Sequence, residues 1–392
     1  MYRLLLMLIY LAFISLGLPD SLLGSAWPTM QAAFEVPMSY MGLVSMIISG
    51  GTICSSLLSE RFTGRFGTKI VTVTSVFLTA VALFGFSTAT EFWMLCLWGI
   101  PYGLGAGAID AALNNYVALH YKARHISWLH CFWGVGTIIS PYVMSYALTH
   151  TVWNEGYRMV SLIQIGIALV LLFTLPVWRV NQKGEADAGT KKVLGIKGAL
   201  HIKGVPYLLT GFFAYCAAEA TTMLWASSYL VGTRGVSREL AAAFASLFFI
   251  GITAGRFLAG FFSDRLGDRR MIQIGFTVAM SGVVCILLPV ETDMLSLAGF
   301  VIIGLGCAPV YPSIIHSTPG NFGAENSQAI IGIQMTSAYI GSTFMPPLFG
   351  ILANHISFKI LPFFLSLFFL LMIFMIEKTY KVCHREEKNK KD

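Results

Sequence analysis

Long apolar stretches, each near the length that crosses a lipid bilayer, recur along the whole chain. A helix needs about 20 mainly apolar residues to span a hydrocarbon core about 30 Å thick. We count twelve such segments, at about residues 4–27, 39–59, 69–89, 92–119, 127–149, 157–179, 204–231, 239–263, 270–290, 294–317, 327–353 and 357–379. The pattern predicts an all-α integral membrane protein with twelve transmembrane helices.

The longest polar stretch, at about 180–203, separates two groups of six segments, and no break holds a soluble domain. We therefore predict an N-terminal six-helix bundle at 1–180, a cytoplasmic linker at 181–203, a C-terminal six-helix bundle at 204–380 and a cytoplasmic tail at 381–392. In the first segment, Gly17 and Pro19 predict a bent or broken helix. The alternative there is a signal peptide, which the lack of a small-x-small cleavage site before Pro19 disfavours.

Composition and charge agree with a membrane protein and orient it. The chain of 392 residues is 56% hydrophobic and only 11% charged, which a soluble domain of this length does not need. Of the 26 Lys and Arg residues, 21 fall in predicted inner segments, 4 in outer segments, and Arg256 lies inside a helix. By the positive-inside rule, both termini are expected in the cytoplasm, with the helices in the plasma membrane. The net charge of +7 is thus a topology signal and does not indicate nucleic-acid binding.

The cysteine spacing and the lack of catalytic motifs argue against several classes of protein. The seven cysteines are scattered without a C-x-x-C pair, so neither a disulfide framework nor a metal site is expected. We find no paired catalytic Ser/His/Asp set, no H-E-x-x-H and no phosphate-binding loop. Metalloprotease chemistry and ATP-driven transport are therefore disfavoured, and we do not expect an enzyme. A non-transporting membrane receptor stays open as a further alternative, and no cofactor is expected besides protons as a coupling ion.

Three of the 19 acidic residues lie well inside predicted helices: Asp20, Asp110 and Glu219. A carboxylate near the bilayer centre costs roughly 2.5–3.5 kcal/mol on insertion scales, so one that stays there usually faces a cavity. Because desolvation favours the neutral carboxylic acid, each is a candidate proton carrier. The alternative for each is a structural hydrogen bond to a neighbouring helix.

Polar and aromatic side chains accompany these carboxyls. Asn114 follows Asp110 by four residues and shares its helix face, and His130 and Trp133 share a face of the next helix. Such groups suit a sugar, which offers hydroxyls to hydrogen-bond and an apolar ring face to stack. The alternatives are core packing or lipid contact for the aromatic residues and interhelical hydrogen bonds for His130 and Gln334. The candidate substrate-binding residues are Trp27, Asn114, Asn115, His130, Trp133, Trp225, Tyr229, Tyr311 and Gln334.

The two halves of the chain resemble each other. The loop at 64–69, GRFGTK, corresponds to DRLGDR at 264–269, and Gly136-x4-Pro141 corresponds to Gly341-x4-Pro346. Leu104-Gly105 before Asp110 likewise corresponds to Leu305-Gly306 before Tyr311. Parallel half-repeats of six helices are the architecture of the major facilitator superfamily.

The stretch at 260–270, GFFSDRLGDRR, resembles the loop signature of that superfamily, G-x-x-x-D-R-x-G-R-R. The resemblance implies a gate at Asp264, Arg265, Gly267 and Arg269, in which Asp264 pairs with an arginine or a helix N-terminus. The alternative is that these charges only anchor topology. The first-half copy has Glu60 for the first glycine and Gly64 for the aspartate, so we expect its loop to be held differently.

Four further motifs are similar to those of the fucose/glucose/galactose:proton symporter family and its bacterial and fungal relatives. They are DAALNNY at 110–116, HCFWGVG at 130–136, Glu219 with Trp225 and Tyr229, and GLGCAPVYP at 304–312. The resemblance implies that Asp20 and Asp110 serve proton coupling and substrate binding. His130 and Trp133 stand where fucose symporters carry glutamine and asparagine, which leaves the identity of the solute open.

Arg256 lies eight residues before Asp264, which is about 12 Å along a helix. Two interpretations remain open for it: pairing with a carboxylate or an anionic group, and snorkelling to the headgroups.

The predicted function is proton-coupled symport of a small polar solute, expected to be a monosaccharide, by a monomer with a cavity between the halves. The alternative is a proton-driven antiporter that exports drugs or metabolites. Exporters of the superfamily often carry G-x-x-x-G-P-x-x-G-G in helix five, and the stretch at 134–141, GVGTIISP, does not match it.

Overall fold

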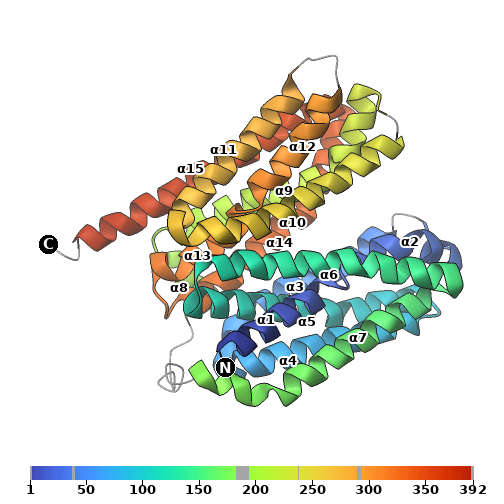
Figure 1. Ribbon diagram of the computed structural model, residues 1–392, viewed down its shortest axis with the longest axis horizontal. Helices are drawn as coiled ribbons and strands as arrows, with labels where there is room; N and C mark the ends of the chain where they lie inside the picture. The colour runs from blue at the N-terminus through green and yellow to red at the C-terminus, as the bar shows by residue number, and fades with distance from the viewer. Residues whose placement is uncertain (1, 38–39, 182–193, 237, 289–292, 390–392) are drawn as a thin grey trace. The chain divides into compact units, whose positions relative to one another are not determined.

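The computed structural model describes residues 2–37, 40–181, 194–236, 238–288 and 293–389 (Figure 1). All regular structure among these residues is helical, and no strand occurs in them. A helix satisfies its own backbone hydrogen bonds, which is the condition for crossing hydrocarbon. The predicted all-α membrane architecture is confirmed.

The helices of the first half follow the predicted segments. They are α1 Tyr2–Gly17, α2 Leu22–Ala33, α3 Tyr40–Leu57, α4 Ser59–Ser87, α5 Phe92–His120, α6 Ala123–His150 and α7 Trp153–Phe173, with the 3₁₀ helix η1 Leu175–Asn181. The pair α1 and α2 occupies the first predicted segment, and α3 to α7 occupy the next five.

The second half follows the same plan. Its helices are α8 Gly195–His201, α9 Val205–Arg234, α10 Arg238–Leu266, α11 Asp268–Leu287, α12 Asp293–Cys307, α13 Val310–Phe322, α14 Ser327–His355 and α15 Leu361–Asn389, with the 3₁₀ helix η3 Phe358–Ile360. The pair α12 and α13 occupies the tenth predicted segment. Part of the predicted linker, 182–193, lies outside the described residues, and the predicted tail is helical through Asn389.

Nine segments of the described residues are long and apolar enough to cross a membrane. They cover the first six predicted spans and the ninth, tenth and twelfth. The three remaining positions are filled by α9, α10 and α14, which are 30, 29 and 29 residues long. Each of these carries one of the polar residues that the sequence singled out: Glu219, Arg256 or Gln334.

The chain forms two compact units. Unit 1 comprises Met1–Tyr116 and Leu129–Gly195, and unit 2 comprises Val117–Trp128 and Ile196–Asp392. The junction of α5 and α6, at 117–128, thus belongs with the second half although the rest of both helices belongs to unit 1. The sequence predicted a division at the linker alone.

Three interruptions depend on proline. The predicted break in the first segment is confirmed, because α1 ends at Gly17 and α2 begins at Leu22, on either side of Pro19. The tenth segment was expected to be continuous, but it breaks before Pro309, which lies at the N-cap of α13. The sixth was expected to reach 179, but α7 ends at Phe173 and Pro176 lies in the following 3₁₀ helix. Proline lacks the backbone N–H and clashes with the preceding turn.

The two loop glycines adopt the same backbone conformation. Gly67 has φ 76° and ψ 154°, and Gly267 has φ 76° and ψ 159°. Side-chain-bearing residues rarely adopt this region, so glycine is required at both turns. The Gly67 kink divides α4 into a short loop helix and the third span, which the sequence placed from 69 onward.

Helices α1 and α6 approach closely because glycine lies at their contact. A Cβ atom at Gly17 would collide with the carbonyl of Trp133, and one at Gly136 would collide with the carbonyl of Ile14. Small residues allow such close approach of membrane helices. This packing positions the end of α1, and hence Asp20, beside Trp133.

Candidate functional site

Asp20 lies at the break between α1 and α2, where two other helices hold its carboxylate. Tyr102 on α5 donates its hydroxyl hydrogen to Oδ1 at 2.9 Å, and Trp133 on α6 donates its indole N–H to Oδ2 at 2.8 Å. Asp20 remains exposed despite these bonds. Unit 1 therefore presents an accessible carboxylate together with an indole and a phenol.

Asp110, Asn114 and His130 form a buried hydrogen-bonded chain in unit 1. Asn114 Nδ2 donates to Asp110 Oδ1 at 2.8 Å, and Asn114 Oδ1 lies 3.1 Å from His130 Nε2. Because an amide oxygen only accepts, His130 donates through Nε2–H. The three residues are 5%, 0% and 6% exposed, and Asn115 is 7% exposed. The predicted shared face of Asp110 and Asn114 is confirmed, and this chain is covered by protein, unlike Asp20.

Unit 2 holds a buried charged pair. Arg256 Nη2 on α10 lies 3.2 Å from Glu219 Oε1 on α9, and the two side chains are 6% and 13% exposed. Arg256 therefore pairs with a carboxylate, and the snorkelling alternative is wrong. The guanidinium also lies over the ring of Tyr311, 6.0 Å from its centroid.

Tyr215 connects this pair to the break between α12 and α13. Its hydroxyl lies 2.9 Å from Glu219 Oε1 and 2.9 Å from the carbonyl oxygen of Cys307. Cys307 is the last residue of α12, so its carbonyl belongs to the interrupted backbone. Glu219 thus contacts a guanidinium on α10 and a phenol on its own helix, α9.

Gln334 is fully buried in α14. Its Oε1 accepts a hydrogen bond from the Thr318 hydroxyl at 3.0 Å, which is the interhelical bond expected as the alternative to substrate binding. Its Nε2 has no hydrogen-bond partner among the described residues.

Three of the predicted substrate-binding aromatic residues contact other parts of the protein. The Trp225 indole donates to the Pro346 carbonyl at 2.8 Å, and the Tyr229 hydroxyl donates to the Ile286 carbonyl at 3.2 Å. Trp27 is 1% exposed and packs edge-on against Phe92. The structure therefore does not bring these three together with the carboxyls, and their binding role stays a prediction.

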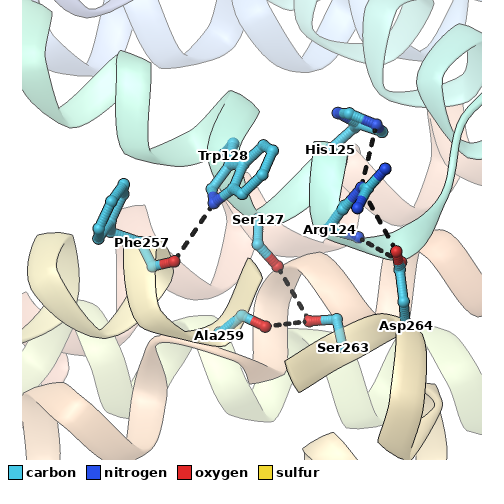
Figure 2. Close-up of polar contacts among 8 residues, drawn as sticks. All are labelled: Arg124, His125, Ser127, Trp128, Phe257, Ala259, Ser263 and Asp264. Carbon is cyan, nitrogen blue, oxygen red and sulfur yellow. Dashed lines mark hydrogen bonds and ion pairs between the residues drawn. The ribbon is translucent and has the colours of Figure 1, made fainter. Parts of the chain in front are cut away.

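Figure 2 shows the contacts of Asp264 at the end of α10. Asp264 Oδ1 accepts from the backbone N–H of Arg124 at 3.2 Å, and Oδ2 lies 3.4 Å from Arg124 Nε (Figure 2). Since α6 begins at Ala123, this N–H belongs to the first turn of a helix, where a negative charge is favoured. Asp264 therefore pairs with an arginine and with a helix N-terminus. These are the two partners that the sequence predicted as alternatives.

Trp128 and Ser127 add contacts between the 117–128 segment and α10. The Trp128 indole donates to the Phe257 carbonyl at 3.3 Å, and the Ser127 and Ser263 hydroxyls lie 3.5 Å apart (Figure 2). A Cβ atom at Gly260 would collide with the Trp128 indole. The first glycine of the loop signature is thus explained by the ring that packs on it.

The remaining loop charges differ in their surroundings. Arg265 is exposed. Arg269 contacts Glu377 on α15 at 2.5 Å. Asp268, which stands at a basic position of the signature, contacts His316 Nδ1 on α13 at 2.8 Å. These pairs join α11 to α15 and α13 within unit 2.

The first-half loop is held differently, as expected. Glu60 accepts hydrogen bonds from the backbone N–H groups of Leu194 and Gly195, at 2.8 and 3.0 Å. Those residues begin α8, so the Glu60 carboxylate contacts the end of the linker between the halves.

Sequence reasoning missed four residues that complete these clusters: Tyr102, Tyr215, Arg124 and Glu377. Tyr215 precedes Glu219 by one helical turn, which is a signal that the spacing carried. The other three approach their partners from distant parts of the chain, and nothing in the sequence indicates which helix they would contact.

Two units of long apolar helices with polar clusters inside them define a multi-pass membrane protein. The family model described as Major Facilitator Superfamily matches residues 9–245 and 207–392. The chain belongs to this family, as its loop signature and half-repeats predicted, and it is a transporter and not an enzyme.

Relatives and solved structures extend the comparison. Bypass of stop codon protein 6 of Saccharomyces cerevisiae is 21% identical over 402 residues, covering 94% of this chain and 80% of the relative. The hexuronate transporter of Bacillus subtilis is 26% identical over 276 residues, covering 65% of this chain and 64% of the relative.

The solved transporters share the fold over most of their length. FucP in the outward conformation has a TM-score of 0.80 at 15% identity, covering 95% of this chain and 98% of FucP. The proton:xylose symporter XylE has a TM-score of 0.78 at 13% identity, covering 95% of this chain and 94% of XylE. At these identities the likeness establishes the fold alone, and it confirms the predicted resemblance to sugar:proton symporters at that level.

Proposed function

We propose that the protein is a proton-coupled symporter that imports a small polar solute of the monosaccharide class. The observation that carries this proposal is the Asp20 cluster. An exposed carboxylate, held by Tyr102 and Trp133 at a helix break, offers both an acceptor for sugar hydroxyls and an aromatic face for the ring.

Asp20, Asp110 and Glu219 are the proposed proton-coupling residues. Each is a carboxyl group within an apolar helical segment, and each accepts at least one side-chain hydrogen bond. In alternating access, the solute and the proton bind from one side and leave together on the other. The names of the solved transporters, which include a proton:xylose symporter, support this choice over export.

We further propose that the contacts of Asp264 form a gate at the cytoplasmic end of the helices. They join α10 to the 117–128 segment, whose neighbours in α5 and α6 carry Asp110, His130 and Trp133. Breaking them would free those helices to move. The bias of Lys and Arg supports cytoplasmic termini in a plasma membrane, and we propose a monomer as the functional unit.

The decisive experiment is uptake of radiolabelled sugars and sugar acids by proteoliposomes that contain the purified protein. We expect accumulation above the outside concentration when the outside is more acidic, and its loss when a protonophore is added. Empty liposomes and the reversed gradient are the controls. Accumulation that persists with the protonophore would contradict proton coupling, and extrusion of solute in exchange for entering protons would favour the exporter.

A further inference from the structure

We infer that the solute carries a negative charge and that Arg256 binds its carboxylate while Glu219 holds the coupling proton. This inference rests on the proposed function and names its substrate class, a monosaccharide carboxylate in place of a neutral sugar. It places one binding contact in unit 2, on α10, outside the Asp20 cluster.

The buried Arg256 guanidinium lies beside a negative charge. The guanidinium is 6% exposed, and its charge is compensated by Glu219 at 3.2 Å. Arginine does not lose its proton in proteins, and removing one partner of a buried ion pair is strongly destabilising. Loss of the Glu219 charge is therefore favoured when another anion takes its place beside Arg256.

The hydrogen-bond partners around Glu219 fit its protonated, neutral form. Tyr215 Oη lies 2.9 Å from two acceptors, Glu219 Oε1 and the Cys307 carbonyl, but a hydroxyl has one hydrogen to donate. When Glu219 is protonated, it donates to Tyr215 Oη, and Tyr215 donates to the carbonyl. Each of the two short oxygen–oxygen contacts then holds one hydrogen, which is impossible while Glu219 is ionised.

Protonation of Glu219 and binding of an anion are then linked. A proton on Glu219 removes the negative charge that lies 3.2 Å from Arg256, and a solute carboxylate restores that charge by taking the place of the Glu219 carboxylate. Each event favours the other by the same factor, as linkage requires. A neutral sugar cannot supply this compensation, so a coupled cycle through Glu219 selects an anion.

The geometry around the pair agrees with a carboxylate ligand. A guanidinium presents a planar fork of N–H donors that matches the two oxygens of a carboxylate. Both partners are largely buried, with Glu219 13% and Arg256 6% exposed, so a bound carboxylate would be shielded from water. The Tyr311 ring lies under the guanidinium, 6.0 Å from its centroid, and helps to hold the fork in place.

The competing interpretation is a permanent structural ion pair. In that case Arg256 and Glu219 stay together throughout transport, and a neutral sugar would bind as well as its acid. The two interpretations differ in one measurable quantity, the preference for a uronate over the hexose that lacks its charge.

Thermal unfolding of the purified full-length protein measures this preference without any gradient. The probes are two matched pairs, glucuronate with glucose and galacturonate with galactose. We expect at least one uronate to raise the unfolding temperature while its hexose does not, and the stabilisation to be larger at mildly acidic than at neutral pH. The pH effect has this sign because protonated Glu219 releases Arg256.

Substitutions then assign the preference to the pair. Glu219→Gln mimics the protonated residue, so we expect tighter uronate binding that no longer changes with pH. Arg256→Gln should weaken uronate binding roughly 10- to 150-fold, the range for a hydrogen bond to a charged group. Because this variant buries Glu219 without its partner, the double substitution E219Q/R256Q provides a charge-neutral background with the same expected loss.

An exposed ion pair provides the matched control. Glu155 and Arg158 on α7 lie 2.7 Å apart with 32% and 44% exposure, and E155Q/R158Q should keep the full uronate preference. Equal stabilisation by hexose and uronate, stabilisation by neither, or a preference that survives in E219Q/R256Q would overturn the inference. Arg256-dependent uronate binding without protonophore-sensitive uptake would instead contradict the proposed proton coupling, while the binding of the solute carboxylate by Arg256 would stand.

Discussion

At the scale of single residues, the three predicted carboxyls are in three different environments. Asp20 is exposed and held by two neutral donors, Asp110 is buried beside an amide, and Glu219 faces an arginine and a phenol. By hydropathy alone, all three are candidate proton carriers because each is one acidic residue in an apolar segment. Their partners differ, so their roles in coupling are expected to differ as well.

Neutral substitutions separate these roles. We expect Glu219→Gln to keep solute exchange between equal concentrations and to lose uphill uptake, because a residue fixed in the neutral form cannot release a proton. Counterflow and gradient-driven uptake in proteoliposomes measure the two activities. Asp110→Asn and Asp20→Asn are the matched comparisons, each replacing a carboxylate by an amide of nearly the same size.

A different outcome would assign the coupling proton to another residue. If Asp110→Asn loses only uphill uptake while Glu219→Gln accumulates solute normally, the coupling site lies in unit 1 and the linkage through Arg256 is contradicted. For Asp20→Asn we expect weaker solute binding, seen as a raised KM, because one of its two accepted hydrogen bonds is lost. Coupled carboxyls titrate together, so the double substitution at Asp20 and Asp110, both in unit 1, belongs in the same series.

At the scale of elements, one carboxylate ties the start of α6 to the end of α10. Asp264 contacts both the backbone N–H and the side chain of Arg124, and Ser127 and Trp128 contact the same helix (Figure 2). Arg124 is 43% exposed and Asp264 is 23% exposed, so solvent screens the ion pair, and each contact is worth about 1 kcal/mol or less.

Graded substitutions at Asp264 test the gate. Asp264→Asn keeps an oxygen that can accept from the Arg124 N–H but removes the charge, and Asp264→Ala removes both. A loss of about 1 kcal/mol corresponds to roughly a fivefold shift toward the open gate. We therefore expect labelling of a reporter cysteine, Ser127→Cys, to increase in Asp264→Asn and further in Asp264→Ala.

The reporter needs a background in which the seven native cysteines are replaced. Ser127 is 1% exposed, so its labelling reports opening of this contact. Glu155→Gln, which disrupts an exposed ion pair on α7, should leave labelling unchanged. Equal labelling in all variants would leave Asp264 as a topology anchor only.

At the scale of the whole molecule, proton and solute charges set the electrical character of transport. A monoanionic sugar acid that moves with one proton on Glu219 transfers no net charge, whereas a neutral sugar with one proton transfers one. The sign and size of the coupled current therefore depend on which solute class Arg256 selects.

Imposed membrane potentials test this electrical character. With a potassium gradient and valinomycin but no pH gradient, we expect no accumulation of the uronate that the protein binds. With a pH gradient and the potential clamped at zero, we expect full accumulation. Uptake driven by the potential alone would contradict electroneutral transport with one proton.

The sequence by itself determined the number and type of the membrane helices, the division into related halves and the glycine turns. Hydrocarbon admits few backbone structures, so apolar length alone fixes the spans. The break at Pro19 and the turn at Gly267 were predictable because each is a backbone effect of one residue and its neighbours.

Only the tertiary structure decided which polar groups meet. Nothing in the sequence indicated that Tyr102 and Trp133 would converge on Asp20, that Arg256 would face Glu219, or that Trp128 would pack on Gly260. The tertiary structure also buries Trp27 and Tyr229 against other helices. The physical reason is that hydropathy places a residue along its own helix, while its partners depend on how separate helices rotate and pack against one another.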